Sequence, residues 1–332
     1  MDLVKTPLPL YFSYDSLDQF LLILSPGLRQ RHAEELKRLD DLKLPPMVSW
    51  SILSTAIGIS PHFINSLIRN KNKYYRVFTI AKGKGKGKGK RVIEAPKVSI
   101  KLIQAWLAFH LSNNDNLKLC DAVHGFIPGQ HGIYEAAKKH CGCDWVLSID
   151  LKDFFRSISY RRVVDAFEQL GYTVAQAEKI AEITTYNTHL PQGAPSSPVI
   201  SNLVFNNTDD AIIRFLEGKG ICYTRYADDL TFSGSDVRYD IEKLKTDLLQ
   251  LISSNGWVVA NEKTHIAKAP NRLKVHGFLV HAETPRLTKG YRNKIRAYAH
   301  LLNSGKVKAE DLDVIRGHVN YGKFIDKLND ER

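Results

Sequence analysis

The sequence predicts an α+β fold in which a small antiparallel sheet is accompanied by amphipathic helices. Two short runs, Ile221–Tyr226 and Leu230–Ser233, alternate with the period of two that is typical of strands and predict a hairpin. A third, apolar run from Trp145 to Ile149 has the character of a buried strand. Between these strands, Ser159 caps a segment with helical apolar spacing that stops at Gly171.

Composition limits the class of protein. The 332 residues are 43% hydrophobic, which is enough for a sizeable core in one large domain or in two or three packed subdomains. The net charge of +12 favours a polyanionic partner, and nucleic acid is the simplest choice. The sequence contains no run of about 18 uncharged apolar residues, so it predicts no membrane-spanning helix. The N-terminus lacks the apolar core of a signal peptide, so we expect a cytoplasmic protein without a membrane partner.

The four cysteines fit a reduced compartment rather than a disulfide framework. Cys141 and Cys143 stand beside His140, which leaves a metal site as an alternative interpretation of this stretch. However, the sequence offers no second ligand pair at the spacing of a zinc site.

Two adjacent carboxylates, Asp228 and Asp229, occupy the predicted hairpin turn. Their negative charges repel each other, and a turn with a purely structural role usually has Asn-Gly or Asp-Gly at this place. A divalent cation would remove the repulsion. A solvated acidic turn is the alternative interpretation. A third carboxylate, Asp150, directly follows the buried strand, and antiparallel pairing can bring it beside Asp228. Such a cluster can hold two Mg²⁺ ions for phosphoryl transfer.

Three motifs together resemble the palm motifs of reverse transcriptases: Tyr226–Asp229, Asp150–Phe155 and Gln192–Pro198. The nearest resemblance is to the bacterial retron group, which is related to the group II intron enzymes. It implies a right-hand polymerase with fingers, palm and thumb. The expected parts are a helical N-terminal extension at 1–70, fingers at 71–145, a palm with interleaved fingers helices at 146–280 and a thumb at 281–332.

The resemblance also implies a role for each residue that matches a family motif. Asp150, Asp228 and Asp229 are expected to be catalytic and, together with Leu151, to bind two Mg²⁺ ions. The residues expected to bind the incoming nucleotide are Arg91, Phe155, Gln192, Gly193 and Lys263. The residues expected to contact RNA or DNA are His140, Lys84, Lys86, Lys88, His276, Gly277, Arg292 and Arg296.

Side-chain chemistry is consistent with these nucleotide-binding roles. Arg91 opens a strand and can offer a rigid guanidinium fork to a triphosphate. Phe155 is expected to lie beneath the sugar, where a ring excludes a ribose 2′-OH and selects deoxynucleotides, whereas Phe154 is expected in the core. Lys263 can protonate or neutralise the leaving pyrophosphate, although a lone lysine is usually a surface charge.

The turn at Gln192 and Gly193 is predicted to approach a base pair closely. Glycine permits such an approach, and the glutamine side chain can reach a sugar or a phosphate. Helix capping explains the neighbouring serines equally well.

Alternating glycine and lysine from Lys82 to Lys90 predict a flexible tip between two strands that seeks phosphate. A merely solvated hairpin tip is the alternative. Further upstream, residues 49–69 have the outline of a helix-turn-helix. Two such helices can simply pack against each other, and sequence-specific reading of DNA is the alternative interpretation.

We therefore predict an RNA-directed DNA polymerase. The resemblance implies a dedicated structured RNA as template and primer, deoxynucleotides as substrates, and a branched, RNA-linked single-stranded DNA as product. It also implies phage defence with a separately encoded effector, and host RNase H acting on the product. Ala136 and His276 stand where retron enzymes usually carry Asn and Thr. They leave open a different defence polymerase derived from reverse transcriptases, protein-primed or untemplated, while a non-catalytic nucleic-acid-binding protein is a further alternative.

Overall fold

The computed structural model describes residues 16–81, 89–236 and 238–330. The predicted tip lysines Lys84, Lys86 and Lys88 lie outside these residues. The chain forms two compact units whose segments alternate along the sequence. The first consists of Met1–Cys120, Phe126–Pro128 and Lys152–Asp209, and the second of Asp121–Gly125, Gly129–Leu151 and Asp210–Arg332.

The first unit is mainly helical. Serine side chains cap the N-termini of its first four helices, each by accepting a hydrogen bond from a main-chain N–H in the first turn. The consecutive helices α3 and α4 and the pair α9 and α10 pack against each other. The helices are α1 (Leu17–Ile23), α2 (Pro26–Asp41), α3 (Trp50–Ile57), α4 (Pro61–Arg69), α5 (Lys71–Tyr74), α6 (Val98–Ser112), α8 (Phe154–Ser157), α9 (Tyr160–Gln169) and α10 (Val174–Thr184).

Within the described part of the chain, no individual helix has the length and apolar character needed to cross a membrane. The helices α3 and α4 reach those limits only when they are taken together, and the pair is bent by 113°.

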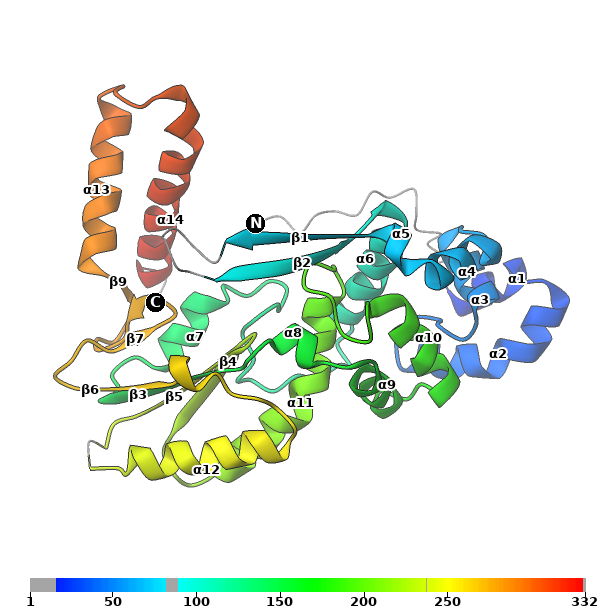
Figure 1. The fold of residues 1–332 in the computed structure, drawn as a ribbon, viewed down its shortest axis with the longest axis horizontal. Coiled ribbons are helices and arrows are strands. Elements are labelled where there is room, and N and C mark those ends of the chain that lie inside the picture. The colour runs from blue at the N-terminus through cyan, green and yellow to red at the C-terminus, as the bar shows by residue number, and fades with distance from the viewer. Residues whose placement is uncertain (1–15, 82–88, 237, 331–332) are drawn as a thin grey trace. The chain divides into compact units, whose positions relative to one another are not determined.

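A two-stranded antiparallel ribbon projects from the first unit (Figure 1). It consists of β1 (Tyr75–Ala81) and β2 (Lys90–Pro96), whose register pairs Tyr75 with Pro96 and Ala81 with Lys90. The two strands that we predicted on either side of the Gly-Lys tip are therefore confirmed.

The second unit is built on a four-stranded antiparallel sheet in the order β4-β5-β3-β6. Its strands are β3 (Trp145–Asp150), β4 (Cys222–Tyr226), β5 (Asp229–Gly234) and β6 (His265–Lys268). The apolar side chains of the central strands β3 and β5 are buried almost without interruption, which places these strands in the core. The predicted hairpin and buried strand are confirmed.

The rest of the second unit consists of helices and a small three-stranded sheet. The helices are α7 (Ile133–Lys139), α12 (Ile241–Ser254), α13 (Lys289–Asn303) and α14 (Leu312–Asp330), with short 3₁₀ turns η2 (Asn261–Lys263) and η3 (Ala309–Asp311). The small sheet consists of β7 (Lys274–Val275), β8 (Phe278–Leu279) and β9 (Arg286–Leu287). Helix α11 (Ser197–Leu216) begins in the first unit and ends in the second.

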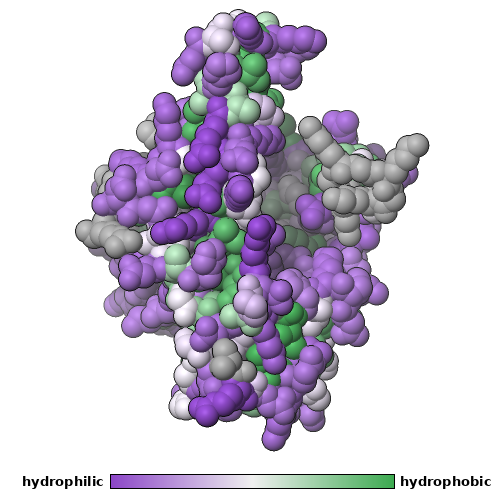
Figure 2. Space-filling model, turned by 90° about the vertical axis from the view of Figure 1, so that its left-hand side faces the viewer, coloured by the Kyte–Doolittle hydropathy of each residue, from purple (hydrophilic) through white to green (hydrophobic). Residues whose placement is uncertain are grey.

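Helices α13 and α14 lie side by side as a hairpin (Figure 1), and their close approach uses Gly322, since a Cβ there would lie 2.9 Å from Ile295 Cδ1. A hydrophobic cluster that includes Val146, Phe278 and Ile325 joins the base of α14 to the two sheets. On the face drawn in Figure 2, hydrophilic side chains predominate, including those at the end of this helical hairpin at the top of the view.

Candidate active site

The acidic turn joins β4 to β5 through only two residues, Ala227 and Asp228. Tyr226 and Asp229 form the last pair of the hairpin, and Ala227 adopts a left-handed backbone conformation with φ of +57°. A residue other than glycine is uncommon in this region and is held there by its surroundings. The turn therefore fixes Asp228 and Asp229 at one edge of the sheet.

Strand β3 brings Asp150 to the same edge. Asp150 lies opposite Asp229 in the antiparallel register, and the main-chain N–H of Leu151 donates a 2.9 Å hydrogen bond to the carbonyl oxygen of Asp228. The predicted convergence of Asp150 with the Asp228 turn is confirmed.

The carboxylates influence one another at this edge. Burial raises the pKa of Asp228 above its ordinary value of 3.8, and the neighbouring carboxylates of Asp150 and Asp229 raise it further. The positive charge of Lys263 acts in the opposite direction. The ionised form of Asp228 is therefore unfavourable in the protein alone, and a bound cation would stabilise it.

Lys263 supplies a cation to this cluster from η2. Its Nζ lies 2.6 Å from Oδ1 of Asp150, and the main-chain N–H of Ala260 donates a 2.8 Å hydrogen bond to the carbonyl oxygen of Asp150. The hydrogen bond to Asp150 is the main cause that raises the pKa of Lys263. Lys263 is therefore a protonated ammonium group beside the acidic turn, a contact that the sequence did not reveal.

The donor set has the chemistry of a magnesium site. Carboxylate oxygens are ligands that Mg²⁺ prefers, and Asp150, Asp228 and Asp229 supply them from one sheet edge. Leu151 can add only its main-chain carbonyl, because its side chain is apolar and buried. Within the described residues, no three acidic, imidazole or thiol side chains already form a metal-holding group. Instead, the ammonium of Lys263 neutralises Asp150.

Two residues that we did not predict support the turn. Residues 122–124 run alongside β4, and a Cβ on Gly125 would lie only 2.6 Å from the main-chain nitrogen of Ala227. The fully buried Arg225 donates from Nη1 to the carbonyl oxygen of Ala227 over 3.3 Å. Gly125 thus permits the close packing beneath the turn, and Arg225 binds its main chain.

His140 is not placed to contact RNA. Its ring is buried, Nδ1 lies 2.6 Å from the hydroxyl of Ser233, and Nε2 lies 2.7 Å from the hydroxyl of Thr224. Both nitrogens are therefore engaged inside the protein, where His140 ties β5 to β4. Burial lowers the pKa of His140 to about 3 and keeps the ring neutral. This position argues against the predicted RNA contact and gives His140 a structural role.

The neighbouring cysteines are free thiols that burial keeps protonated. Burial raises the pKa of Cys141 and Cys143 to about 11 each. Because thiolates are the metal-binding form and His140 has no nitrogen to spare, the alternative metal site at this stretch gains no support.

His276 and Gly277 form the turn between β7 and β8, both with positive φ. The side chain of His276 is only 6% exposed, and its Nδ1 lies 3.4 Å from Oδ2 of Asp229. Its ring also lies near that of Tyr226, with centroids 5.5 Å apart. The structure therefore places His276 against the acidic turn, whereas Gly277 is exposed.

In the first unit, Phe155 lies on α8 with its side chain partly exposed, while Phe154 is buried. The helix follows Asp153, which has a left-handed backbone with φ of +48°. The ring centroid of Phe126 lies 6.2 Å from that of Phe155. The prediction that these adjacent rings differ in burial, with Phe154 in the core, is confirmed.

The Gln192–Gly193 turn is joined to β2. The main-chain N–H of Glu94 donates a 2.9 Å hydrogen bond to the carbonyl oxygen of Gln192. Gly193 has φ of +130°, and a Cβ there would lie 3.0 Å from Cγ2 of Ile93. Contact within the protein therefore already requires glycine at this position. Arg91 stands at the start of the same strand and is exposed.

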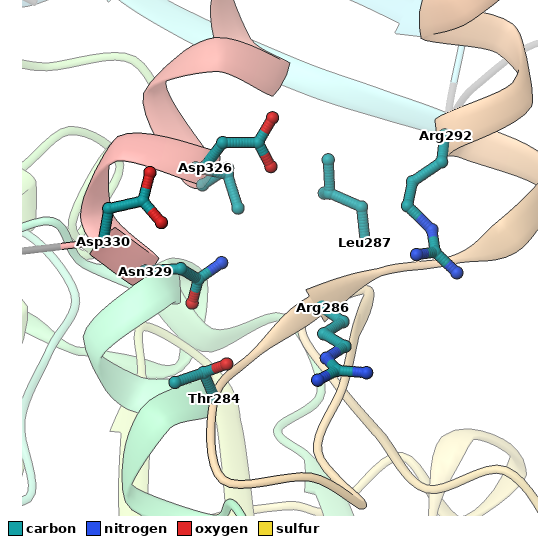
Figure 3. A pocket seen from close by; sticks show the side chains of 8 residues that line it. Thr284, Arg286, Leu287, Arg292, Asp326, Asn329 and Asp330 are labelled. Atoms are coloured by element: carbon teal, nitrogen blue, oxygen red, sulfur yellow. The ribbon is translucent and has the colours of Figure 1, made fainter.

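Arg292 and Arg296 are exposed on α13, as the predicted contact with nucleic acid requires. Arg292 also lines a pocket of about 480 Å³ at the base of the helical hairpin (Figure 3). Arg286 and Arg292 lie on one side of this pocket, and Asp326 and Asp330 on α14 lie on the other. The pocket therefore has charges of both signs.

Comparison with known proteins agrees with this architecture. Residues 80–280 match the model of the family described as reverse transcriptase (RNA-dependent DNA polymerase). The chain is 32% identical over 295 residues to the Retron Ec86 reverse transcriptase of Escherichia coli, covering 89% of this chain and 90% of that one. The chain belongs to the retron reverse transcriptases. This retron reverse transcriptase is an RNA-directed DNA polymerase with the right-hand fold that the sequence predicts.

A second relative is the Retron Mx65 reverse transcriptase of Myxococcus xanthus, which is 30% identical over 299 residues. The alignment covers 84% of this chain and 67% of the relative. Among solved structures, telomerase from Candida albicans in complex with a TWJ fragment of telomeric RNA superposes with a TM-score of 0.46 and 11% identity. That alignment covers 71% of this chain and 53% of the telomerase chain.

Proposed function

We propose that this polymerase copies part of a dedicated structured RNA into single-stranded DNA at the acidic turn of the second unit. The observation that carries the proposal is the pairing of Asp150 with Asp229 and of Leu151 with Asp228 at one sheet edge. In the proposed site Asp150, Asp228 and Asp229 bind two Mg²⁺ ions, and Leu151 adds its carbonyl.

Bound Mg²⁺ would activate the primer hydroxyl and stabilise the leaving oxygen. The protein groups have separate tasks. Asp150 and Asp228 hold their carboxylates at the edge because β3, β5 and the turn are hydrogen-bonded together. Lys263 carries a proton beside them and is the group that we propose donates it to the leaving pyrophosphate, or neutralises that group.

We further propose that Arg91, Phe155, Gln192 and Gly193 bind the incoming deoxynucleotide, and that Phe155 excludes the ribose 2′-OH. The support is the exposed guanidinium at the start of β2, the partly exposed ring on α8 and the turn held against β2. Exposed Gly277, Arg292 and Arg296 are proposed to contact the nucleic-acid duplex, and His276 to act through Asp229. The lysines of the Gly-Lys tip are proposed to bind phosphate, on the basis of the sequence alone.

The proposed product is DNA joined to its RNA through a ribose 2′-OH, made in the cytoplasm. Host RNase H is proposed to remove the template, and a separately encoded effector to act with the complex in phage defence. Support for these proposals comes from membership of the retron family, whose curated relatives carry retron names.

The test is primer extension by purified protein on an RNA template with deoxynucleotides and Mg²⁺, next to the Asp150→Asn variant. We expect incorporation by the wild type alone, lost on chelation of Mg²⁺. Sequencing of DNA made in cells then tests the product. One defined sequence with an RNA branch at its 5′ end supports the proposal, whereas random or protein-linked DNA would indicate an untemplated or protein-primed polymerase.

A further inference from the structure

Glu94 is a buried carboxylate that the proposed mechanism does not use. Its side chain on β2 is only 3% exposed, and two basic side chains, those of Arg156 and His189, contact it. Oε1 accepts a hydrogen bond from Nη2 of Arg156 over 2.9 Å, and Oε2 lies 2.9 Å from Nε2 of His189. A carboxylate buried in this way needs hydrogen-bond donors to compensate its lost hydration, and Arg156 and His189 supply one at each oxygen.

Both ring nitrogens of His189 are engaged inside the protein. Its Nδ1 lies 2.9 Å from the carbonyl oxygen of Asn187, and its Nε2 faces the Glu94 carboxylate. Each of these partner oxygens can accept a hydrogen bond from the ring. The His189 ring and the Arg156 guanidinium thus each hold one oxygen of the Glu94 carboxylate.

A strained turn presents His189 to this carboxylate. Asn187 and Thr188 are consecutive residues with left-handed backbones, at φ of +47° and +68°, inside a turn closed by hydrogen bonds between Tyr186 and His189. A β-branched residue such as threonine strongly disfavours this region. Such strain persists where the surrounding contacts fix the conformation.

The three segments that meet at Glu94 each carry a proposed nucleotide-binding residue. Arg91 precedes Glu94 on β2, Phe155 is adjacent to Arg156 on α8, and Gln192 follows His189 in its loop. The main chain adds a further link, since the N–H of Glu94 donates to the carbonyl oxygen of Gln192. One residue thus contacts all three segments through its side chain and its backbone.

We propose that Glu94 is the positioning residue of the nucleotide pocket. Through Arg156 it fixes the helix that carries Phe155, and through His189 and its own main chain it fixes the Gln192–Gly193 turn relative to the strand of Arg91. It thereby sets the discrimination between deoxyribose and ribose. This inference rests on the proposed function.

The test compares Glu94→Gln with the wild type in single-nucleotide extension, using deoxynucleotides and ribonucleotides. Glutamine keeps the shape and removes the charge. We expect KM for the deoxynucleotide to rise about tenfold while kcat changes less than about twofold, and sugar discrimination to fall about tenfold, which corresponds to losing one charge-assisted hydrogen bond. Asp165→Asn is the matched control, because it breaks the exposed Arg161–Asp165 ion pair on α9 of the same unit. It should change neither quantity.

Arg156→Met tests the link between Glu94 and α8 alone. It also keeps the proposal testable if the Glu94 variant does not fold, because Arg156 is 43% exposed and its replacement leaves Glu94 paired with His189. It should lower sugar discrimination with little change in the KM of the deoxynucleotide. Unchanged discrimination in Glu94→Gln would overturn the role of Glu94, as would losses in either variant that merely follow the folded fraction measured by thermal unfolding. The proposed function has its own readout, Mg²⁺-dependent incorporation by the wild type that Asp150→Asn lacks. Without that incorporation both proposals fail, whereas an active wild type with an unaffected Glu94→Gln overturns only this one.

Discussion

The ammonium of Lys263 lies 2.6 Å from Oδ1 of Asp150, so a protein cation already neutralises one of the proposed metal ligands. Lys263 should therefore compete with Mg²⁺ for Asp150 and also supply a proton during the reaction. We expect Lys263→Met to lower kcat about 100-fold, within the range for a lost general acid, and to lower the Mg²⁺ concentration at half-maximal rate. Steady-state extension at varied Mg²⁺ measures both. Lys268→Met, an exposed lysine on β6, is the control and should change neither.

Asp228→Asn should abolish incorporation and stabilise the metal-free protein. Because the pKa of Asp228 is raised, the folded state holds this proton more firmly than the unfolded chain. The resulting stabilisation is complete below the unfolded value of 3.8 and is lost as pH rises through the higher folded value. At pH 7 the variant should gain about 1 kcal/mol in free energy of unfolding, because the uncharged amide removes the cost of burying a charge.

Denaturant titration in EDTA measures this gain, which should shrink as the pH is lowered toward 3.8. Added Mg²⁺ should stabilise the wild type but not the variant. Asp247→Asn on α12 provides a comparison away from the turn. A variant less stable than the wild type in EDTA at pH 7 would contradict the electrostatic account.

Phe155→Ala should admit ribonucleotides, because removing the ring makes room for a 2′-OH. The ratio of kcat/KM for a deoxynucleotide to that for the matching ribonucleotide should fall at least about tenfold. Phe154→Leu is the matched control, since the neighbouring ring is buried. It should lower the melting temperature and leave the ratio unchanged, and an unchanged ratio in Phe155→Ala would refute the assignment of Phe155.

His140→Asn should reduce the free energy of unfolding by about 2–3 kcal/mol, because it leaves the buried hydroxyls of Ser233 and Thr224 without their partners. RNA affinity of the folded variant at pH 7, measured by fluorescence anisotropy, should match the wild type. Lys138→Gln on α7 serves as the solvent-exposed comparison. Lost RNA affinity with full stability would restore the predicted RNA contact.

The same variant tests a pH dependence. The pKa of His140 is about 3 in the folded protein against 6.5 in the unfolded chain, so the unfolded chain binds the proton more strongly. Wild-type stability should therefore fall as pH decreases from 6.5 toward 3, and the difference between wild type and variant should narrow over this interval.

Gly125→Ala should displace the acidic turn, because the new Cβ would lie 2.6 Å from the main-chain nitrogen of Ala227. We expect at least about a 100-fold loss of kcat, since small misplacements of catalytic groups have large effects on rate. Gly317→Ala is the control, as a Cβ there meets nothing within 4 Å inside α14. It should raise stability by up to about 1 kcal/mol and preserve activity.

Strand periodicity and the placement of acids predicted the core of the site. Asp150 and Asp229 are strand-terminal residues, so pairing of the strands was enough to bring them together. The burial of individual polar side chains could not be inferred in the same way. The resemblance implied that His140 contacts RNA, but only the packed structure shows its ring hydrogen-bonded to two strands.

Buried charges were missed for a related reason. Arg225 and Glu94 stand in strands at positions where alternation permits a solvent-facing side chain. Their partners are a turn carbonyl for Arg225, and for Glu94 the side chains of Arg156 and His189, which are far along the chain. Neither spacing nor propensity encodes such contacts, because those of Glu94 depend on where distant segments meet and that of Arg225 depends on the conformation of the turn that follows it.

Strand β3 lies between β5 and β6, both of which are synthesised long after it. During translation β3 therefore has no strand to pair with, and its apolar residues stay unpaired until β5 and then β6 have left the ribosome. Shortened expression clones that end before Lys268 would leave this strand with an open side and should precipitate or bind chaperones.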